Sequence, residues 1–228
     1  MSCPLLFEAM KIKSPAAAGA YDSQCRACPR LATFLDQVRT DHPGYFCLPV
    51  PPFGVANPDL LIVGLAPGLH GANRTGRPFT GDYAGVLLYQ TLHRFGFATG
   101  SESVSADDAL QLKACRITNA VKCLPPQNKP LPVEIRTCNT FLANELAALP
   151  STPAILALGT VAHAAVLTAL GLKAGFCKFS HGASHLLPDG RRLFDSYHCS
   201  RYNTNTRRLT EAMFHEVFAA IREHIDQR

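Results

Sequence analysis

"AILALGTVAHAAVLTALG", residues 154–171, is the stretch that decides the fold class of this chain. Its first six residues form a short apolar run, which is typical of a strand buried on both faces. Residues 160–170 follow at once with the composition of a buried helix, and Gly171 is a natural residue to end that helix. A strand that runs directly into a helix is the repeating unit of a parallel sheet, so we expect an α/β protein.

Similar patterns flank this unit on both sides. Apolar runs at 60–65 and 114–123 predict two more buried strands, and residues 183–198 predict a hairpin that turns at 189–190 and ends a strand at His198. Helical apolar spacing appears at 85–97, 132–149 and 206–225, with Pro132 suited to a first turn. These elements predict a three-layer α/β/α sandwich around a central, mostly parallel four-stranded sheet.

Length and composition favour one domain. The chain has 228 residues, of which 47% are hydrophobic, enough for one sizeable core. We expect residues 1–20 to be irregular and 21–228 to form the domain, with a proline-rich connector at 49–58 and a polar loop or short helix at 101–113. No apolar run reaches membrane-spanning length and no export signal is evident, which predicts a cytoplasmic protein without membrane contact. The net charge of +5 permits a polyanionic partner without requiring one.

Nine cysteines in a cytoplasmic protein need an explanation, because disulfides are rare there and an odd number cannot all pair within one chain. Cys25 and Cys28 have the spacing by which one turn presents two thiolates to a metal. Cys123 follows the predicted strand at 114–121, and Cys138 lies in the predicted helix at 132–149. Four thiolates suit zinc or an iron–sulfur cluster, and ligand type alone does not separate the two. The alternative is a CxxC pair beside unrelated core cysteines.

The loop "GLAPGLHGANRTGRPFTGD", residues 64–82, follows the first predicted strand. It lacks both the Gly-Lys-Ser/Thr ending of a P-loop and the spacing of a dinucleotide fingerprint. Its one carboxylate is Asp82, at the end. In an open α/β sheet, ligands bind beyond the carboxyl ends of the strands, where residues 64–82, 119–130 and 198–210 are all expected to lie.

Three side chains in these segments each have a functional and a structural interpretation. Asn119 at a strand end offers a donor and an acceptor to a planar ligand, or satisfies a local turn. His198 opens a polar loop in which Ser200, Asn203 and Asn205 can hold phosphate, although Thr204 or Asn205 can also simply cap the closing helix. Phe79 stacks on a flat ring or fills the core.

In their order along the chain, these motifs resemble the uracil-DNA glycosylase superfamily, specifically family 5 of its iron–sulfur branch (the UDGb type). The residues that carry the resemblance are "GLAPGLHGANRTGRPFTGDYAG" (64–85), "ITNAVKCLPPQNKP" (117–130), "HCSRYNTNTRRLT" (198–210) and the four cysteines. Family 4 has an acidic residue in the first motif where this chain has Leu65. The resemblance implies a monofunctional DNA glycosylase that removes uracil and other deaminated bases, hypoxanthine among them, from DNA. It also implies a 4Fe–4S cluster held by Cys25, Cys28, Cys123 and Cys138.

The resemblance further implies a role for each site residue. Phe79 stacks on a flipped base, Asn119 reads its edge, and His198 donates a hydrogen bond to the departing base. Asp82 orients water or steadies the cationic sugar. The remaining substrate-binding positions are Gly64, Ala66, Pro67, Gly68, Ser200 and Asn203. We expect DNA containing uracil or other deaminated bases as the partner, and a monomer.

The chain departs from the family pattern in the histidine motif. Cys199 replaces the usual proline, and Arg201 and Tyr202 stand where another proline is common. These changes leave the residue that fills the emptied base stack unidentified. The alternatives are a family 4-like enzyme restricted to uracil, a non-catalytic metal-stabilised DNA-binding module, and a redox protein that uses the cluster for electron transfer.

Overall fold

The computed structural model describes residues 21–228, so the irregular segment predicted at 1–20 lies outside the described residues. These residues form a six-stranded sheet of order β1-β3-β2-β4-β6-β5. Its strands are β1 (Phe53–Gly54), β2 (Leu60–Gly64), β3 (Cys115–Asn119), β4 (Ala154–Leu158), β5 (Ser184–Leu186) and β6 (Arg192–Ser196). The four central strands are parallel, whereas β1 and β5 pair antiparallel at the two edges.

The predicted four-stranded sheet is therefore correct for the parallel centre and wrong for the whole. The predicted hairpin is confirmed, and its first arm adds β5 as an edge strand. The other added strand, β1, is two residues long and lies in the segment expected to be a connector, where Phe53 pairs with Ile117. A strand of two residues is too short to show the alternation of polar and apolar residues by which a strand is predicted from sequence.

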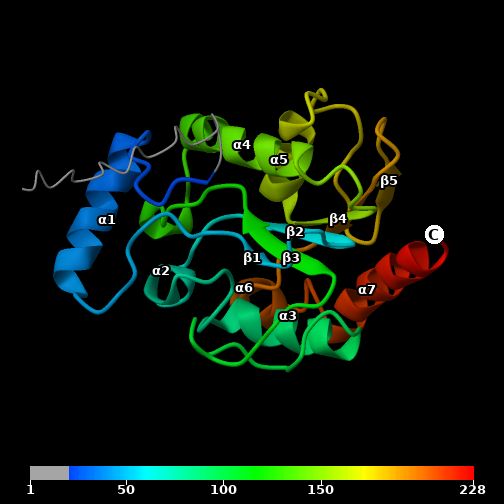
Figure 1. The fold of residues 1–228 in the computed structure, drawn as a ribbon, viewed down its shortest axis with the longest axis horizontal. Coiled ribbons are helices and arrows are strands. Elements are labelled where there is room, and N and C mark those ends of the chain that lie inside the picture. The colour runs from blue at the N-terminus through cyan, green and yellow to red at the C-terminus, as the bar shows by residue number, and fades with distance from the viewer. Residues whose placement is uncertain (1–20) are drawn as a thin grey trace, which may run out of the picture.

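Helices cover both faces of the sheet (Figure 1), and the alternation of side chains along each strand explains why. On one face, Leu61, Val63, Ile155 and Leu193 pack with α4 (Pro132–Ala147) and α5 (Thr160–Ala169). The neighbouring strand residues turn to the other face, where they pack with α3 (Tyr83–Arg94) and α7 (Glu211–Asp226). The predicted three-layer sandwich is confirmed.

Three shorter or peripheral helices complete the described residues. They are α1 (Pro29–Asp41), α2 (Ala72–Thr75) and α6 (Arg201–Asn205), with a 3-10 turn at Pro126–Asn128. The sequence predicted none of these, and residues 101–113 contain no helix. The predicted helix at 206–225 begins later, at Glu211, and its cap is Thr210, which accepts a hydrogen bond from Met213 N, rather than Thr204 or Asn205. Within residues 21–228, no helix is long and apolar enough to span a bilayer.

Candidate functional site

The carboxyl ends of the parallel strands bring the three predicted loops together. Gly64 and Asn119 end β2 and β3 and lie opposite each other in the register, and β6 ends two residues before His198. A cavity of about 460 Å³ opens at this edge, a size typical of small-ligand sites. It is lined by Leu65, Ala66, Gly68, Ala72, Phe79, Asp82, Tyr83, Ala84, Asn119, Asn128, His198, Ser200 and Arg201. We call this space the base pocket.

Phe79 and His198 form the aromatic wall of the base pocket. Their ring centroids lie 5.8 Å apart at an interplanar angle of 28°. The backbone of Phe79 has φ 55°, a left-handed conformation that is uncommon for a bulky residue and costs about 1–3 kcal/mol. Glycine at position 85 permits it, because a Cβ there would lie 1.8 Å from the carbonyl oxygen of Phe79. The chain thus holds this ring in a strained position, as functional sites often do.

Asn119 lines the base pocket, and its side-chain oxygen is an unpaired acceptor. The residue is 3% exposed, and its Oδ1 has no hydrogen-bond partner among residues 21–228. Buried polar atoms are almost always paired, so an orphan oxygen at a cavity wall favours the functional interpretation over a local turn. Gly64 makes room for it, because a Cβ at that position would lie 2.4 Å from Asn119 Oδ1 and 2.7 Å from the Phe79 ring.

Asp82 has two tasks at the mouth of the base pocket. Its Oδ1 caps α3 by accepting a hydrogen bond from Gly85 N at 3.0 Å. Its Oδ2 faces the loop at 64–71, which we call the glycine loop. A Cβ added to Gly71 would lie 2.3 Å from this oxygen, and one added to Gly68 would lie 3.5 Å from it. Burial raises the pKa of this carboxyl above its usual value, and the backbone N–H groups of α3 only partly oppose that rise.

His198 is neutral at physiological pH. Burial lowers its pKa from 6.5 to about 4, because the charged ring would lose its hydration. A neutral imidazole still carries one N–H, so the ring can donate a hydrogen bond. Cys199 beside it is fully buried, and that burial, with Asp82 nearby, raises the pKa of its thiol. A thiol held protonated in this way is not a nucleophile.

Three predicted site residues, Gly64, Pro67 and Asn203, lie outside the lining of the base pocket. Asn203 stands behind it, where its Nδ2 donates to the carbonyl oxygen of His198 at 2.8 Å. Ser200 lines the pocket and also caps α6 by accepting from Asn203 N. Pro67 is buried and does not line the pocket either. Asn203 is therefore placed to position the histidine loop rather than to contact a ligand.

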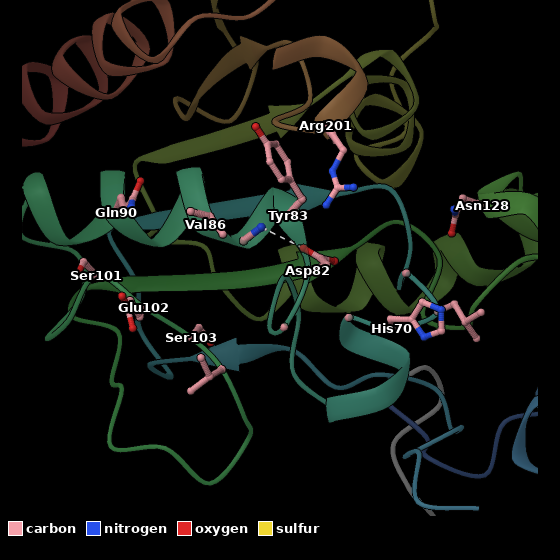
Figure 2. A pocket seen from close by; sticks show the side chains of 16 residues that line it. His70, Asp82, Tyr83, Val86, Gln90, Ser101, Glu102, Ser103, Asn128 and Arg201 are labelled. Atoms are coloured by element: carbon pink, nitrogen blue, oxygen red, sulfur yellow. Dashed lines mark hydrogen bonds between the residues drawn. The ribbon is translucent and has the colours of Figure 1, made fainter. Parts of the chain in front are cut away.

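A second, wider cavity of about 770 Å³ adjoins the base pocket and shares five of its lining residues, among them Asp82, Tyr83 and Arg201. Figure 2 shows Tyr83, Val86 and Gln90 projecting from α3, with Ser101, Glu102 and Ser103 below them and Arg201 above Asp82. The Arg201 guanidinium lies over the Tyr83 ring, 4.9 Å from its centroid. Sequence reasoning missed Tyr83 and Asn128. Tyr83 follows Asp82 directly, a signal that could have found it.

The four predicted cluster cysteines meet in a separate place. Cys25, Cys28, Cys123 and Cys138 all line one small cavity that shares no residue with the base pocket. Burial raises the pKa of Cys123 to about 12, and the nearby charges of the other three thiolates add to that rise. Cys138 Sγ accepts a hydrogen bond from Lys122 N at 3.3 Å. Four converging thiols and a backbone N–H directed at sulfur fit a four-thiolate metal centre.

The cysteine cavity also joins α1 to the rest of the chain. Cys28 stands at the N-terminus of α1, and Arg30 forms a bidentate ion pair with Glu134 of α4 at 2.7 and 2.8 Å. Leu31 of α1 packs with Val121 and Cys138. A centre bound here would therefore fasten α1 to the segment that follows β3.

The family model of the uracil DNA glycosylase superfamily matches residues 51–222. A type-5 uracil-DNA glycosylase of Thermus thermophilus is 47% identical over 198 residues, which cover 85% of this chain and 90% of that protein. One of Mycobacterium leprae is 45% identical over 205 residues, covering 86% and 89%. A type-4 uracil-DNA glycosylase of Pyrobaculum aerophilum is 34% identical over 126 residues, covering 55% and 56%. Similarity to the type-5 proteins is higher and spans more of the chain.

Proposed function

Because this chain belongs to the uracil DNA glycosylase superfamily and is a DNA glycosylase of the type-5 kind, we propose that it acts on flipped-out bases. Uracil and other deaminated bases, hypoxanthine among them, enter the base pocket, and the N-glycosidic bond is hydrolysed to leave an abasic site. Flipping costs a few kcal/mol and is cheapest for a mispaired base, which supplies part of the selectivity. The observation that carries the proposal is the unpaired Oδ1 of Asn119 beside the Phe79 ring.

Recognition follows from these two side chains. Uracil and hypoxanthine each carry a ring N–H beside a carbonyl, and that N–H is a donor for Asn119 Oδ1. Phe79 offers its ring face for stacking, a contact worth about 1–3 kcal/mol per base. The small residues of the 64–68 loop let the ring approach the backbone. A pocket that reads an N–H next to a carbonyl accepts several deaminated bases, which supports a specificity wider than uracil.

The chemical step divides charge between base and sugar. As the bond breaks, negative charge grows on the base and positive charge on the sugar, and a donor placed at the base oxygen lowers the barrier. Neutral His198 supplies that N–H without a proton being released to the base. Asp82 lies on the glycine-loop side of the pocket, where its carboxylate steadies the sugar cation or orients water. No lysine is among the lining residues of the base pocket, which supports a monofunctional enzyme without strand cleavage.

The test is a panel of oligonucleotides, each with one lesion, incubated with excess enzyme and then treated with alkali. Uracil and hypoxanthine strands should both be cut after alkali, and neither without it. Cutting before alkali would contradict the monofunctional mechanism. Activity on uracil alone would favour the family 4-like alternative, and no product from any lesion would leave a non-catalytic DNA-binding module.

We also propose that Cys25, Cys28, Cys123 and Cys138 hold a 4Fe–4S cluster. Bound there, the cluster supplies a structural cross-link rather than catalysis, because the cysteine cavity is separate from the base pocket. Cys123→Ser should lower iron content and solubility together. Cys47→Ser is the matched control, because Cys47 is buried but outside the cavity and its Sγ accepts a weak hydrogen bond from Asn73 Nδ2. Full iron retention in Cys123→Ser would remove that ligand.

Finally, we propose that residues 21–228 act as one domain and that the protein binds DNA as a monomer. One sheet is packed between two layers of helices, and this arrangement supports a single folding unit. Light scattering of the free protein and of its complex with a short duplex should give the mass of one chain in each. A mass of two chains in both would overturn the monomer.

A further inference from the structure

A second group of side chains of metal-binding type lies outside the base pocket, the wider cavity beside it and the cysteine cavity. It comprises His163 of α5, Cys177 in the loop after α5, and His185 of β5. One ligand atom from each lies within 4.8 Å of the other two. Asp195 of β6 shares this site, on the sheet face that also carries Leu193 and is covered by α5.

Asp195 holds both histidine rings in place. It is fully buried, and its Oδ1 lies 2.8 Å from His163 Nδ1 while its Oδ2 lies 3.2 Å from His185 Nε2. A carboxylate that orients a metal-binding histidine through its second ring nitrogen is the usual outer partner in zinc sites. Here one carboxylate contacts two histidines, so both ring orientations are fixed before any ligand arrives.

This arrangement directs a lone pair of His163 at Cys177. When Nδ1 of the neutral ring donates to Asp195, Nε2 carries no hydrogen and can act only as an acceptor. Yet Nε2 lies 3.2 Å from the carbonyl oxygen of Cys177, another acceptor, and 3.9 Å from its Sγ. Between these atoms the weak S–H donor of Cys177 supplies the hydrogen, and a metal ion that displaces this proton would bind the ring nitrogen and the thiolate together.

The distance between the Cys177 and His163 ligand atoms is close to that expected around a small tetrahedral ion. Zinc binds sulfur at about 2.3 Å and nitrogen at about 2.0 Å, which places two such ligands about 3.6 Å apart. The observed 3.9 Å between Cys177 Sγ and His163 Nε2 needs a shift of a few tenths of an ångström. Imidazole and thiolate ligands favour zinc over magnesium or calcium, and a single cysteine cannot hold an iron–sulfur cluster. Cys177 and His185 are partly exposed, which gives the ion a route in.

We propose that His163, Cys177 and His185 bind one Zn²⁺ per chain, with Asp195 as the outer carboxylate and the fourth position open to water. The ion joins the loop at 173–183 and β5 to α5. The same loop reaches the histidine motif, because His181 Nδ1 accepts a hydrogen bond from Tyr197 N and Tyr197 directly precedes His198. The zinc site therefore braces the strand end that carries His198 from the opposite face of the sheet.

The experiment uses full-length protein with its iron content measured, treated with chelator and dialysed against a slight excess of Zn²⁺. The wild type should take up one zinc per chain at constant iron. Cys177→Ser and His163→Gln should each lose at least nine-tenths of that zinc, whereas the control variants Cys47→Ser and His215→Gln should keep it. Asp195→Asn should bind zinc about 10–100-fold more weakly.

A second measurement needs no variant and so does not depend on folding. Alkylation of Cys177 by iodoacetamide, followed at its own peptide by mass spectrometry, should be slow with zinc and should speed up at least tenfold after chelation. Equal alkylation rates with and without zinc would overturn the proposal. So would full zinc uptake by Cys177→Ser, or no uptake by the wild type.

Discussion

At the scale of single residues, Asn119 carries an unusual combination of burial and an unpaired oxygen. Asn119→Ala should lower the single-turnover rate on uracil about 10–100-fold, the worth of one hydrogen bond of about 1–3 kcal/mol. The same change should raise the free energy of unfolding by about 1 kcal/mol, because it removes a buried acceptor that no protein group satisfies. Urea unfolding beside the kinetics checks both.

These opposite signs separate the two interpretations of Asn119. If Asn119 instead satisfies a local turn, its truncation should lower the free energy of unfolding and should change the excision rates of all bases by the same factor. A variant that is less stable than the wild type and fully active would return Asn119 to the structural role.

His198 gives a prediction for the pH dependence of stability. An unfolded chain takes up a proton on this ring near pH 6.5, whereas the folded protein does so only near pH 4. Between these values the unfolded state binds more protons, so the free energy of unfolding should fall as the pH drops from about 6.5 to about 4. His198→Phe removes the titrating group and should flatten this part of the curve. Denaturant unfolding at each pH, with wild type and variant side by side, isolates the contribution of His198.

His198 and Asp82 are proposed to stabilise the base anion and the sugar cation respectively, so substitutions at the two positions should depend differently on the leaving group. His198→Ala should cost about 10²–10³ in rate on poor leaving groups and less on bases that leave readily. Asp82→Asn removes a charge that serves the sugar, so its loss should be even across bases. Rates on a series of bases with graded acidity measure both. Proportional losses in the two variants would contradict this division.

At the scale of elements, one ion pair fastens the loop at 101–108 to the strand-end loop that carries Phe79. Arg77 is 4% exposed and lies 2.6 Å from Asp108 Oδ2. Although burial opposes it, Arg77 and three backbone N–H groups lower the pKa of Asp108 to about 2. This contribution to stability is present above the ordinary pKa and is lost as the pH falls through about 2.

Asp108→Asn should therefore destabilise the protein by about 3 kcal/mol at pH 7, because it leaves the Arg77 charge buried without its partner. Asp107→Asn, one residue away and exposed, is the control and should change stability by less than about 0.5 kcal/mol. Thermal unfolding of the three proteins at one pH provides the comparison. Equal midpoints would contradict this prediction and show that the acceptors Arg77 already has, such as Ser103 Oγ at 2.8 Å, are enough for its charge.

Elements also show what the sequence could and could not reveal. The four parallel strands and α3, α4, α5 and α7 were predicted, because long apolar runs and helical spacing report burial directly. The edge strand β1 is too short for any pattern, and α1 was missed although its buried residues Leu31, Leu35 and Val38 have helical spacing. The His163–Cys177–His185 group combines residues of three separate elements, so no local motif marks it. A polar residue in a loop, such as Asn203, has the same appearance in the sequence whether it binds a ligand or supports the loop. Its hydrogen bond to the carbonyl oxygen of His198 depends on the geometry of the turn, which the sequence does not reveal.

At the scale of the whole molecule, the net charge of +5 and the position of Arg201 bear on DNA binding. Arg201 is exposed and lines both the base pocket and the wider cavity beside it, so we expect it to contact the phosphates that flank a flipped base. Arg201→Gln should weaken binding to all sequences and reduce the slope of log K against log salt by about 1. Arg26→Gln, at an exposed arginine that is paired with Asp36 and lines neither cavity, should leave the slope unchanged. Fluorescence anisotropy over a range of salt concentrations measures the slope.

The orphan oxygen of Asn119 has a consequence for the life of the product. A pocket that is complete except for one missing donor fits the excised base as well as it fits the base in DNA. Free uracil should therefore compete with substrate and raise the melting temperature of the enzyme, while cytosine, whose N3 carries no hydrogen, should do neither. A simple thermal scan with free bases would then rank the lesions that this protein recognises, without any DNA in the tube.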